Sequence, residues 1–260
     1  MDQFQLGAKI FMGGGLDDLL AGRQKVLIVS DRFLVDSGKV SYVADAAARA
    51  GAEHRVFSDV QADPDIATVT AGVGLLLEFQ PDAVVAFGGG SAIDAAKAIL
   101  FFSAKQQDVR DVLFAAVPTT SGTGSEVSRF AVITDREKEI KYPLVDDKLL
   151  PNAAVLDPVL TVSVPPVVTA DTGIDVFTHA VEAFVSTAHT DFSDAAAEKA
   201  IKLAYHNLLE AYRTPDNLEA RQKMHNASCL AGIAFSNSGL GLNHGMAHAL
   251  GAHFHISHGR

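Results

Sequence analysis

The chain has 260 residues, of which 48% are hydrophobic and 20% are charged, and its formal net charge is −10. This is the composition of a folded globular protein, and the length is enough for one large or two ordinary domains. The acidic balance argues against nucleic acid and against an anionic membrane surface as partners. The single cysteine, Cys229, cannot form an internal disulfide, and no apolar run is long enough to span a bilayer. We therefore expect a cytoplasmic protein.

The first part of the chain alternates between short apolar, β-branched runs and segments of helical periodicity. Strands are predicted at residues 26–30, 54–58, 83–87, 112–117 and 153–156. Helices are predicted between them at residues 43–50, 65–78 and 94–102. This alternation predicts an open, mostly parallel sheet with helices on both faces. Residues 127–133 and 141–144 are predicted to form an additional antiparallel pair.

The pattern changes after Pro165 and Pro166, because a proline pair favours a boundary over a helix interior. Helices are predicted at residues 173–185, 191–213, 217–236 and 242–250. We therefore predict an α/β domain over residues 1–161 and an all-α domain over residues 162–260. The wide apolar faces of these helices lead us to expect that a helical remainder of the second domain is missing from this sequence.

Two loops that follow predicted strands carry candidate ligand-binding groups. Residues 88–91, Gly-Gly-Gly-Ser, lie where a strand meets a helix, so the backbone can approach a pyrophosphate and the helix N-terminus attracts it. A plain strand-to-helix turn is the alternative. Residues 118–126 offer hydroxyl and amide groups for ribose or phosphate, or else form a loop that caps its own helix through Ser125. Both loops belong to the sheet edge where open α/β proteins bind ligands.

Asp31 ends the first predicted strand. A carboxylate there can accept hydrogen bonds from an adenosine ribose and repels a 2′-phosphate, which favours NAD over NADP. The alternative role is an N-cap of the next helical turn, and Asp31 taken alone fits that role better. The usual Gly-x-Gly-x-x-Gly fingerprint after the first strand is absent, and residues 13–15, Gly-Gly-Gly, precede that strand and are interpreted as a turn.

Asp175 and His179 are four residues apart, as are His244 and His248, and on a helix this spacing places two side chains on one face. A carboxylate and several imidazoles suit a divalent transition metal, which in enzymes polarises a substrate oxygen. The alternative for Asp175 and His179 is a solvated helical face. Three further histidines lie near the end of the sequence: His253, His255 and His258. Their spacing does not show which of them would complete the set of metal ligands.

Several segments resemble the iron-containing alcohol dehydrogenase family, and the resemblance spans the whole chain. They are Gly-Gly-Gly-Ser-Ala-Ile-Asp-Ala-Ala-Lys at 88–97, Pro-Thr-Thr-Ser-Gly-Thr-Gly-Ser-Glu-Val at 118–127, Asp-Pro at 157–158, Pro-Pro at 165–166, Thr-Gly-Ile-Asp-Val-Phe-Thr-His-Ala-Val-Glu-Ala at 172–183 and Gly-Leu-Asn-His-Gly-Met-Ala-His at 241–248. The resemblance implies a Rossmann-like open parallel sheet followed by an all-α metal-binding domain, as in dehydroquinate synthase. Family members continue past His258 and Gly259 into further helices, so it also implies an incomplete second domain.

The resemblance assigns expected roles to individual residues. His248 matches the histidine near the substrate and is the candidate proton carrier. The residues that match the metal ligands are Asp175, His179, His244 and His258. Those that match the cofactor-binding positions are Asp31, Asp63, Gly88, Gly89, Gly90, Ser91, Thr119, Thr120, Thr123 and Lys141.

The activity implied by the resemblance is NAD(H)-dependent interconversion of a short-chain primary alcohol and its aldehyde, with Fe²⁺ as the metal and Zn²⁺ as the second choice. Residues 140–144, 191–203 and 223–228 are similar to members that act on 1-propanol in propanediol-utilisation microcompartments. Propanal and 1-propanol are therefore the expected substrates. A homodimer or higher homo-oligomer is expected, in the cytoplasm or inside a microcompartment with shell or enzyme partners.

Three alternatives to this activity stay open. The chain is compatible with a zinc-dependent polyol dehydrogenase of the glycerol type, which has the same fold. A lyase of this fold would use NAD transiently, but it should carry more basic residues for an anionic substrate. An inactive, truncated fragment that binds nucleotide without turnover is the third alternative.

Overall fold

The structure is a computed structural model that describes residues 3–138, 140–254, 256 and 259–260. The chain divides into two units. The α/β unit comprises Ala8–Pro118 and Arg129–Val155, and the helical unit comprises Met1–Gly7, Thr119–Ser128 and Leu156–Arg260. The sequence predicts a border after residue 161 between a dinucleotide-binding domain and a metal-binding domain. This functional division stays a prediction.

The α/β unit is built on a six-stranded sheet. Its strands are β1 (Lys9–Met12), β2 (Lys25–Asp31), β3 (Glu53–Val60), β4 (Ala83–Gly88), β5 (Leu113–Pro118) and β8 (Ala153–Leu156). They lie in the order β1-β8-β5-β4-β2-β3, and the five from β8 to β3 pair in parallel. Every residue of β4 is buried, which explains the continuous apolar run there, because helices cover both faces of a parallel sheet.

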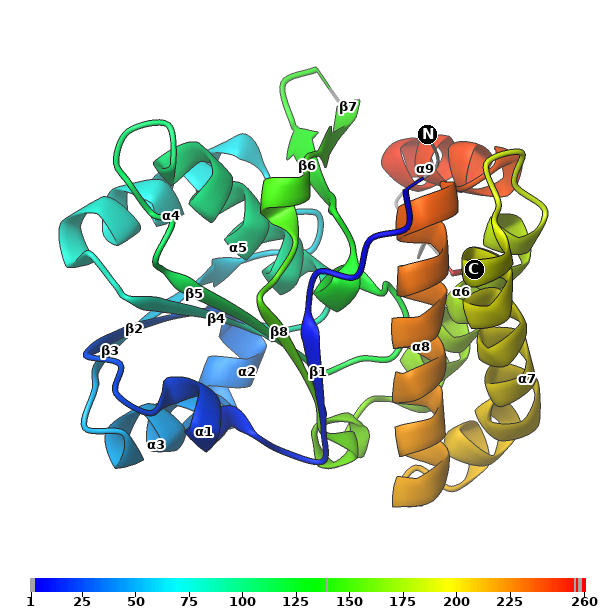
Figure 1. The fold of residues 1–260 in the computed structure, drawn as a ribbon, viewed down its shortest axis with the longest axis horizontal. Helices are drawn as coiled ribbons and strands as arrows, with labels where there is room; N and C mark the ends of the chain where they lie inside the picture. The colour runs from blue at the N-terminus through cyan, green and yellow to red at the C-terminus, as the bar shows by residue number, and fades with distance from the viewer. Residues whose placement is uncertain (1–2, 139, 255, 257–258) are drawn as a thin grey trace. The chain divides into compact units, whose positions relative to one another are not determined.

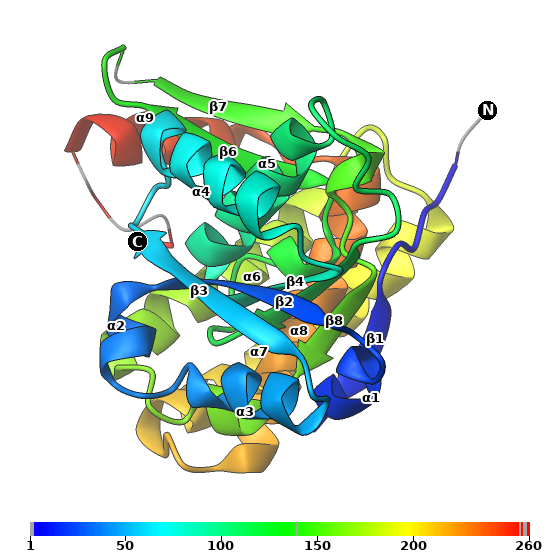
Figure 2. The same ribbon diagram turned by 90° about the vertical axis from the view of Figure 1, so that its left-hand side faces the viewer.

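Helices lie on both faces of this sheet (Figures 1 and 2). One face carries α4 (Ile66–Phe79) and α5 (Gly90–Ser103), and the other carries α1 (Leu16–Leu20), α2 (Arg32–Asp36) and α3 (Ser41–Arg49). The predicted parallel α/β architecture is confirmed. Strand β1 and helices α1 and α2 lie outside the predicted elements, because four or five residues are too few to show a helical or strand period.

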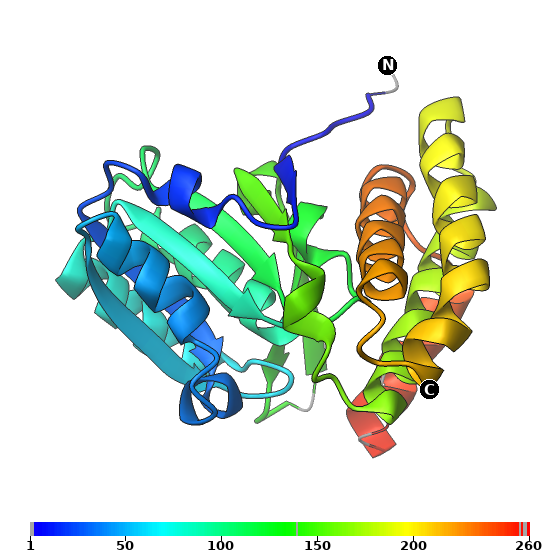
Figure 3. The ribbon, with the colours of Figure 1, turned by 90° about the horizontal axis from the view of Figure 1, so that it is seen from below.

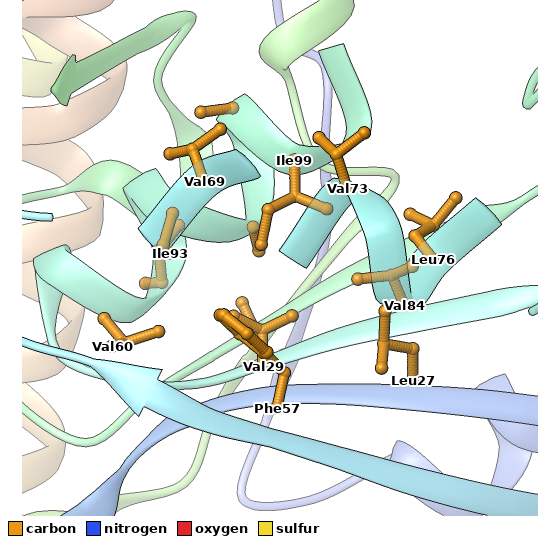
Figure 4. Packing of buried hydrophobic residues seen from close by; sticks show 14 of the residues in the cluster. Leu27, Val29, Phe57, Val60, Val69, Val73, Leu76, Val84, Ile93 and Ile99 are labelled. Carbon is orange, nitrogen blue, oxygen red and sulfur yellow. The ribbon is translucent and has the colours of Figure 1, made fainter. Parts of the chain in front are cut away.

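The core of the α/β unit lies between the sheet and α4 and α5. Figure 4 shows Ile99 of α5 beside Val69 and Val73 of α4, above the side chains of β2 and β4. The two helices approach closely at Gly72, where an added Cβ would lie 2.2 Å from Ile99 Cδ1. A glycine in the middle of α4 therefore serves helix packing.

The second pair of strands is β6 (Phe130–Asp135) and β7 (Ile140–Val145), which are antiparallel as predicted. Two side chains of α5 hold β6 in place. The buried Lys97 Nζ donates to the Phe130 carbonyl at 2.7 Å, and Asp94 Oδ2 accepts the Val132 N–H at 3.0 Å. The second half of the segment at 88–97 thus binds strand β6 to helix α5.

The helical unit contains α6 (Pro166–Phe184), α7 (Asp191–Arg213), α8 (Leu218–Ser238) and α9 (Leu242–Phe254), with short 3₁₀ helices at Ser125–Val127 and Pro158–Thr161. Another 3₁₀ helix, Asp147–Leu149, lies in the α/β unit. Helices α6, α7 and α8, coloured yellow-green to orange, lie side by side (Figure 3), around a core rich in alanine. Helix α6 begins at Pro166 and not at the predicted residue 173, because proline is tolerated in the first turn. No helix in the described part of the chain is both long and apolar enough to cross a membrane.

Candidate metal centre and nucleotide-binding loops

Two helices of the helical unit bring three of the predicted metal ligands together. Asp175 and His179 lie one turn apart on α6, and His244 lies in the first turn of α9. Asp175 Oδ1 is 3.7 Å from His179 Nε2 and 3.4 Å from His244 Nε2. One ligand atom from each residue lies within 4.8 Å of the others, and all three side chains are buried. Two imidazoles and a carboxylate, gathered in this way, fit a divalent transition metal.

The ring of His179 is held between two other rings. Its centroid lies 4.7 Å from that of Phe235 on α8 and 4.3 Å from that of His244, and both pairs are stacked. Packing on both sides restricts rotation of the imidazole. Three helices therefore determine the orientation of this candidate ligand.

Glu182 is a further residue of this site, and the sequence-based reasoning missed it. Its Oε2 lies 2.5 Å from His244 Nδ1, and its Oε1 accepts the Asn243 N–H at 2.7 Å. Glu182 follows Asp175 by seven positions and His179 by three on α6. Because side chains three, four and seven positions apart share a helical face, this spacing was a signal that could have identified Glu182.

Charges and hydrogen bonds shift the pKa values of the two partners. Burial acts to raise the pKa of Glu182, but hydrogen bonds from His244 and from the backbone N–H groups of Gly241 and Asn243 outweigh it, so the pKa is lowered. Burial acts to lower the pKa of His244, but hydrogen bonds to Asp175 and Glu182 outweigh it, so this pKa is raised. Glu182 is therefore a carboxylate at neutral pH and accepts hydrogen bonds through both oxygens.

Two further histidines, His248 and His258, are predicted to belong to this cluster. His248, the candidate proton carrier, is half-buried on α9, and its ring centroid lies 6.3 Å from that of His244. His258, the predicted fourth ligand, lies outside the described residues, as does His255. The assignment of His258 stays a prediction.

The first glycine-rich loop continues directly from β4 into α5. Gly88 ends the strand at φ +155°, and an added Cβ would lie 2.7 Å from Ala92 Cβ, so no larger residue fits. Gly89 is the N-cap residue of α5, and Gly90 and Ser91 form its first turn. The helix begins four residues before the predicted start, which leaves the backbone N–H groups of the loop at the start of a 14-residue helix.

Asp31 lies next to this loop at the end of β2. Its Oδ1 accepts the Leu34 N–H at 2.9 Å and caps α2, and its Oδ2 lies 3.5 Å from the position of a Cβ built on Gly88. Chain order reverses between β2 and β4, because β3 pairs on one side of β2 and β4 on the other. Such a switch point is where open α/β sheets bind their ligands. Asp31 is therefore an N-cap residue that also lies beside the glycine loop, and its contact with an adenosine ribose stays a prediction.

Asp63 and Lys141, two predicted cofactor contacts, pair with each other. Lys141 Nζ lies 2.7 Å from Asp63 Oδ1, and the lysine side chain is mostly buried whereas that of Asp63 is exposed. Asp63 has a φ of +55°, which is rare for a residue with a Cβ. The structure thus brings the two residues together at one point, from β7 and from the loop after β3.

The second loop starts from Pro118, the register partner of Gly88, so both loops leave the sheet from the same edge. Its residues Thr119–Ser128 belong to the helical unit, where a Cβ on Gly124 would lie 2.6 Å from Gly232 Cα of α8. Thr119 is buried, Thr120 is half-buried, and Thr123 Oγ1 accepts the Ser125 N–H at 3.3 Å. Ser125 is not an N-cap; Gly124 occupies that position, because its φ of +61° suits glycine.

An open parallel sheet with a glycine-rich loop at its switch point, together with a helical unit whose buried carboxylate and imidazoles could hold a metal, is an architecture suited to an enzyme that binds a nucleotide and a metal ion. Sequence profiles of the iron-containing alcohol dehydrogenase family match residues 12–158, and those of the family's C-terminal part match residues 169–260. The chain belongs to the iron-containing alcohol dehydrogenase family and is an oxidoreductase.

Individual relatives cover the whole chain. The 1-propanol dehydrogenase PduQ of Citrobacter freundii is 48% identical over 261 residues, which are 100% of this chain and 70% of the relative. The crystal structure of a 1,3-propanediol oxidoreductase has 35% sequence identity to this chain and a TM-score of 0.93. The match covers 100% of this chain and 72% of the oxidoreductase chain. The structure of sulfoacetaldehyde reductase from Bifidobacterium kashiwanohense in complex with NAD⁺ has 33% sequence identity to this chain and a TM-score of 0.92. The match covers 100% of this chain and 73% of the reductase chain. The predicted fold class is confirmed, and the chain spans about 70% of the length of these relatives.

Proposed function

We propose that this dehydrogenase interconverts a short-chain primary alcohol and its aldehyde, with 1-propanol and propanal as the preferred pair, and uses NAD(H) and a divalent metal. The observation that carries the proposal is the buried group of Asp175, His179 and His244, whose ligand atoms lie within 4.8 Å of one another. The similarity to the 1-propanol dehydrogenase of C. freundii supports the choice of substrate.

The proposed metal is Fe²⁺, with Zn²⁺ as the second choice, since both accept imidazole and carboxylate ligands. When bound, the metal supplies a Lewis acid that polarises the oxygen of the alcohol or aldehyde. Asp175, His179 and His244 would hold it, and His258 is the proposed fourth ligand. Burial of these side chains keeps water from competing for the site.

The chain's other residues bind the dinucleotide and move the proton. NAD(H), when bound, would supply or accept the hydride. His248, half-buried with its ring centroid 6.3 Å from that of His244, is the proposed carrier of the proton that leaves or arrives. The N-terminus of α5 is proposed to bind the pyrophosphate. Asp31, beside Gly88, is proposed to accept hydrogen bonds from the ribose and to disfavour a 2′-phosphate, so that NAD(H) is preferred to NADP(H).

The test is an assay of the full chain for NADH oxidation with propanal, under anaerobic conditions. We expect no turnover in the presence of a chelator, restoration by ferrous ions, and lower kcat/KM with NADPH than with NADH. Glycerol with NAD⁺, assayed in parallel, should be a poor substrate. Equal rates with and without metal would contradict the proposal, and a preference for glycerol would favour the zinc-dependent polyol dehydrogenase.

Two variants test the fourth ligand in the same preparation. His258→Ala should abolish tight metal binding, measured as metal retained after gel filtration, whereas His255→Ala should leave it intact. Equal losses in both variants would show that the wrong histidine has been chosen. The proposed location, in the cytoplasm or inside a microcompartment, and the proposed homo-oligomer stay predictions.

A further inference from the structure

The carboxylate of Glu182 connects the two helices that supply the candidate metal ligands. Glu182 lies near the end of α6, and its two oxygens contact two successive residues of α9, which follow it by 61 and 62 positions. Oε1 accepts the Asn243 N–H at 2.7 Å, and Oε2 is 2.5 Å from His244 Nδ1. The side chain is 89% shielded from solvent, so water offers it little alternative bonding.

The contact with Nδ1 determines which nitrogen of His244 carries hydrogen. A carboxylate only accepts, so Nδ1 must donate its hydrogen to Glu182. In the neutral ring Nε2 then keeps a lone pair, and this atom lies 3.4 Å from Asp175 Oδ1, inside the candidate metal centre. A neutral His244 ring that donates through Nδ1 therefore has the tautomer and the orientation that metal binding requires.

The contact with Asn243 gives α9 a cap that its own sequence lacks. The residue before α9 is Gly241, which has no side chain to accept the unpaired N–H groups of the first turn. Glu182 accepts one of them from a different helix, and its negative charge suits a helix N-terminus. An added Cβ on Gly241 would lie 2.9 Å from Glu182 Oε1, so the carboxylate is closely fitted to this turn.

We propose that Glu182 is the positioning residue of the metal centre, which holds His244 in the tautomer and the orientation that direct Nε2 to the metal. This inference rests on the proposed function, because it concerns metal binding by Asp175, His179 and His244. Hydrogen bonds of this kind behind a ligating histidine orient the ring and increase its basicity. Glu182 itself does not touch the metal or the substrate.

The principal test is Glu182→Gln in the full chain, with Zn²⁺ and Co²⁺ affinities measured by isothermal titration calorimetry. If the amide oxygen accepts the Asn243 N–H, the NH₂ group faces Nδ1 and places the ring hydrogen on Nε2, where it blocks metal binding. In the reverse orientation the NH₂ group of the glutamine faces the Asn243 N–H, so that two hydrogen-bond donors meet and the cap of α9 is lost. We expect the affinity for both metals to fall roughly 10- to 100-fold, with an unchanged far-UV circular dichroism spectrum.

The matched control is Glu198→Gln on α7, which removes the same charge at an exposed position that pairs with Lys202. It should leave metal affinity unchanged. A loss in Glu198→Gln as large as in Glu182→Gln would overturn the proposal, because it would show an effect of net charge. Unchanged affinity in Glu182→Gln would also overturn it.

A second readout follows the tautomer directly in the metal-free protein. Long-range ¹H–¹⁵N NMR spectra distinguish a histidine with hydrogen on Nδ1 from one with hydrogen on Nε2. We expect the His244 signal, assigned by its loss in His244→Gln, to show hydrogen on Nδ1 in the unsubstituted protein and on Nε2 in Glu182→Gln. The same tautomer in both proteins would overturn the proposal.

Two more variants separate failure of this inference from failure of the proposed function. Asp175→Asn should abolish binding of both Zn²⁺ and Co²⁺. If the unsubstituted chain binds neither metal, the proposed function fails. In that case the NMR comparison alone decides whether Glu182 sets the tautomer of His244. If Glu182→Gln does not fold, Gly241→Ala replaces it, because its methyl group displaces the carboxylate without a change of charge. Gly241→Ala should weaken Zn²⁺ binding, and unchanged binding would overturn the proposal.

Discussion

At the scale of single residues, polar side chains in the sequence motifs and at the predicted cofactor positions make contacts within the protein itself. Asp31 caps α2, Lys97 donates to a carbonyl of β6, and Asp63 pairs with Lys141. The buried Lys97 in particular needs its partner, because an unsatisfied buried polar group costs about 1–3 kcal/mol. A substitution at one of these positions is therefore expected to change stability, which must be measured beside any change in cofactor binding.

The buried His225 should make stability depend on pH. Burial lowers its pKa from 6.5 to about 4, while the carbonyl and charge of Asp157 act in the opposite direction. The unfolded chain then binds more protons between pH 6.5 and pH 4, so stability falls as pH falls through this window. The contribution of His225 to this loss is about 3 kcal/mol, from 1.36 kcal/mol per pKa unit.

The variant His225→Gln removes this titration and keeps a polar group beside the Ser121 hydroxyl, which lies 3.1 Å from Nδ1. Urea unfolding at several pH values should show a shallower decline of the unfolding free energy below pH 6.5. His206→Gln, at an exposed position on α7, serves as the control and should keep the original slope. An unchanged slope in His225→Gln would rule out His225 as the source.

At the scale of elements, the sites are made where helices begin. Helix α5 begins inside the glycine-rich loop, and α9 begins at the candidate metal centre, where Glu182 of α6 accepts the Asn243 N–H. The second loop is fitted against α8 at Gly124 and Gly232, where neither residue has room for a side chain. Helix starts are suited to this role because their backbone N–H groups are available to ligands or to capping groups.

The contact between α4 and α5 predicts opposite effects for two glycines in one helix. In Gly72→Ala the new Cβ would lie 2.2 Å from Ile99 Cδ1 and 2.7 Å from Cγ1, at a buried position. We expect a loss of about 1–3 kcal/mol in unfolding free energy, because overpacking outweighs the gain in helix propensity. Denaturant unfolding measures this change.

Gly74→Ala is the matched control, two residues further along α4. This position is exposed, and an added Cβ meets nothing within 4 Å. The unfolding free energy should rise by about 0.5–1 kcal/mol, the usual preference for alanine over glycine in a helix. A loss of stability in Gly74→Ala similar to that in Gly72→Ala would show that contact with Ile99 is not the cause.

At the scale of the whole molecule, the candidate metal ligands among the described residues, Asp175, His179 and His244, all belong to the helical unit. Most predicted cofactor contacts, among them Asp31 and Gly88, belong to the α/β unit, whereas Thr119, Thr120 and Thr123 belong to the helical unit. A ligand that binds the folded state alone stabilises it by about 2.7 kcal/mol at a hundredfold excess over its dissociation constant. Metal and nucleotide should therefore each protect a different set of amides.

Hydrogen–deuterium exchange with mass spectrometry tests this division. Addition of Zn²⁺ should slow exchange in α6 and α9 and leave β2, β4 and α5 unchanged, whereas NADH should slow exchange at the start of α5. A chelator should reverse the effect of Zn²⁺, and Asp175→Asn should remove it. Equal protection of both units by Zn²⁺ would contradict the assignment of the metal to the helical unit.

Local patterns in the sequence were sufficient to predict the alternating strands and helices and the position of the glycine-rich loop. They also placed Asp175 and His179 on one helical face, because a spacing of four residues has a fixed meaning in a helix. The predicted N-cap role of Asp31 is local as well, since it concerns a residue and its next three neighbours.

Only the tertiary structure decided which distant groups meet. The contact of Glu182 with His244 spans 62 positions and that of Lys141 with Asp63 spans 78. The helical spacing of Glu182 shows which face of α6 it shares with Asp175, but no spacing shows which residue of α9 it meets. Such pairs depend on how whole helices and strands pack, which is determined by many apolar contacts together and not by the residues of the pair. Local spacing therefore predicted the candidate ligands and the helices that carry them, whereas packing brings Glu182 into contact with one of them.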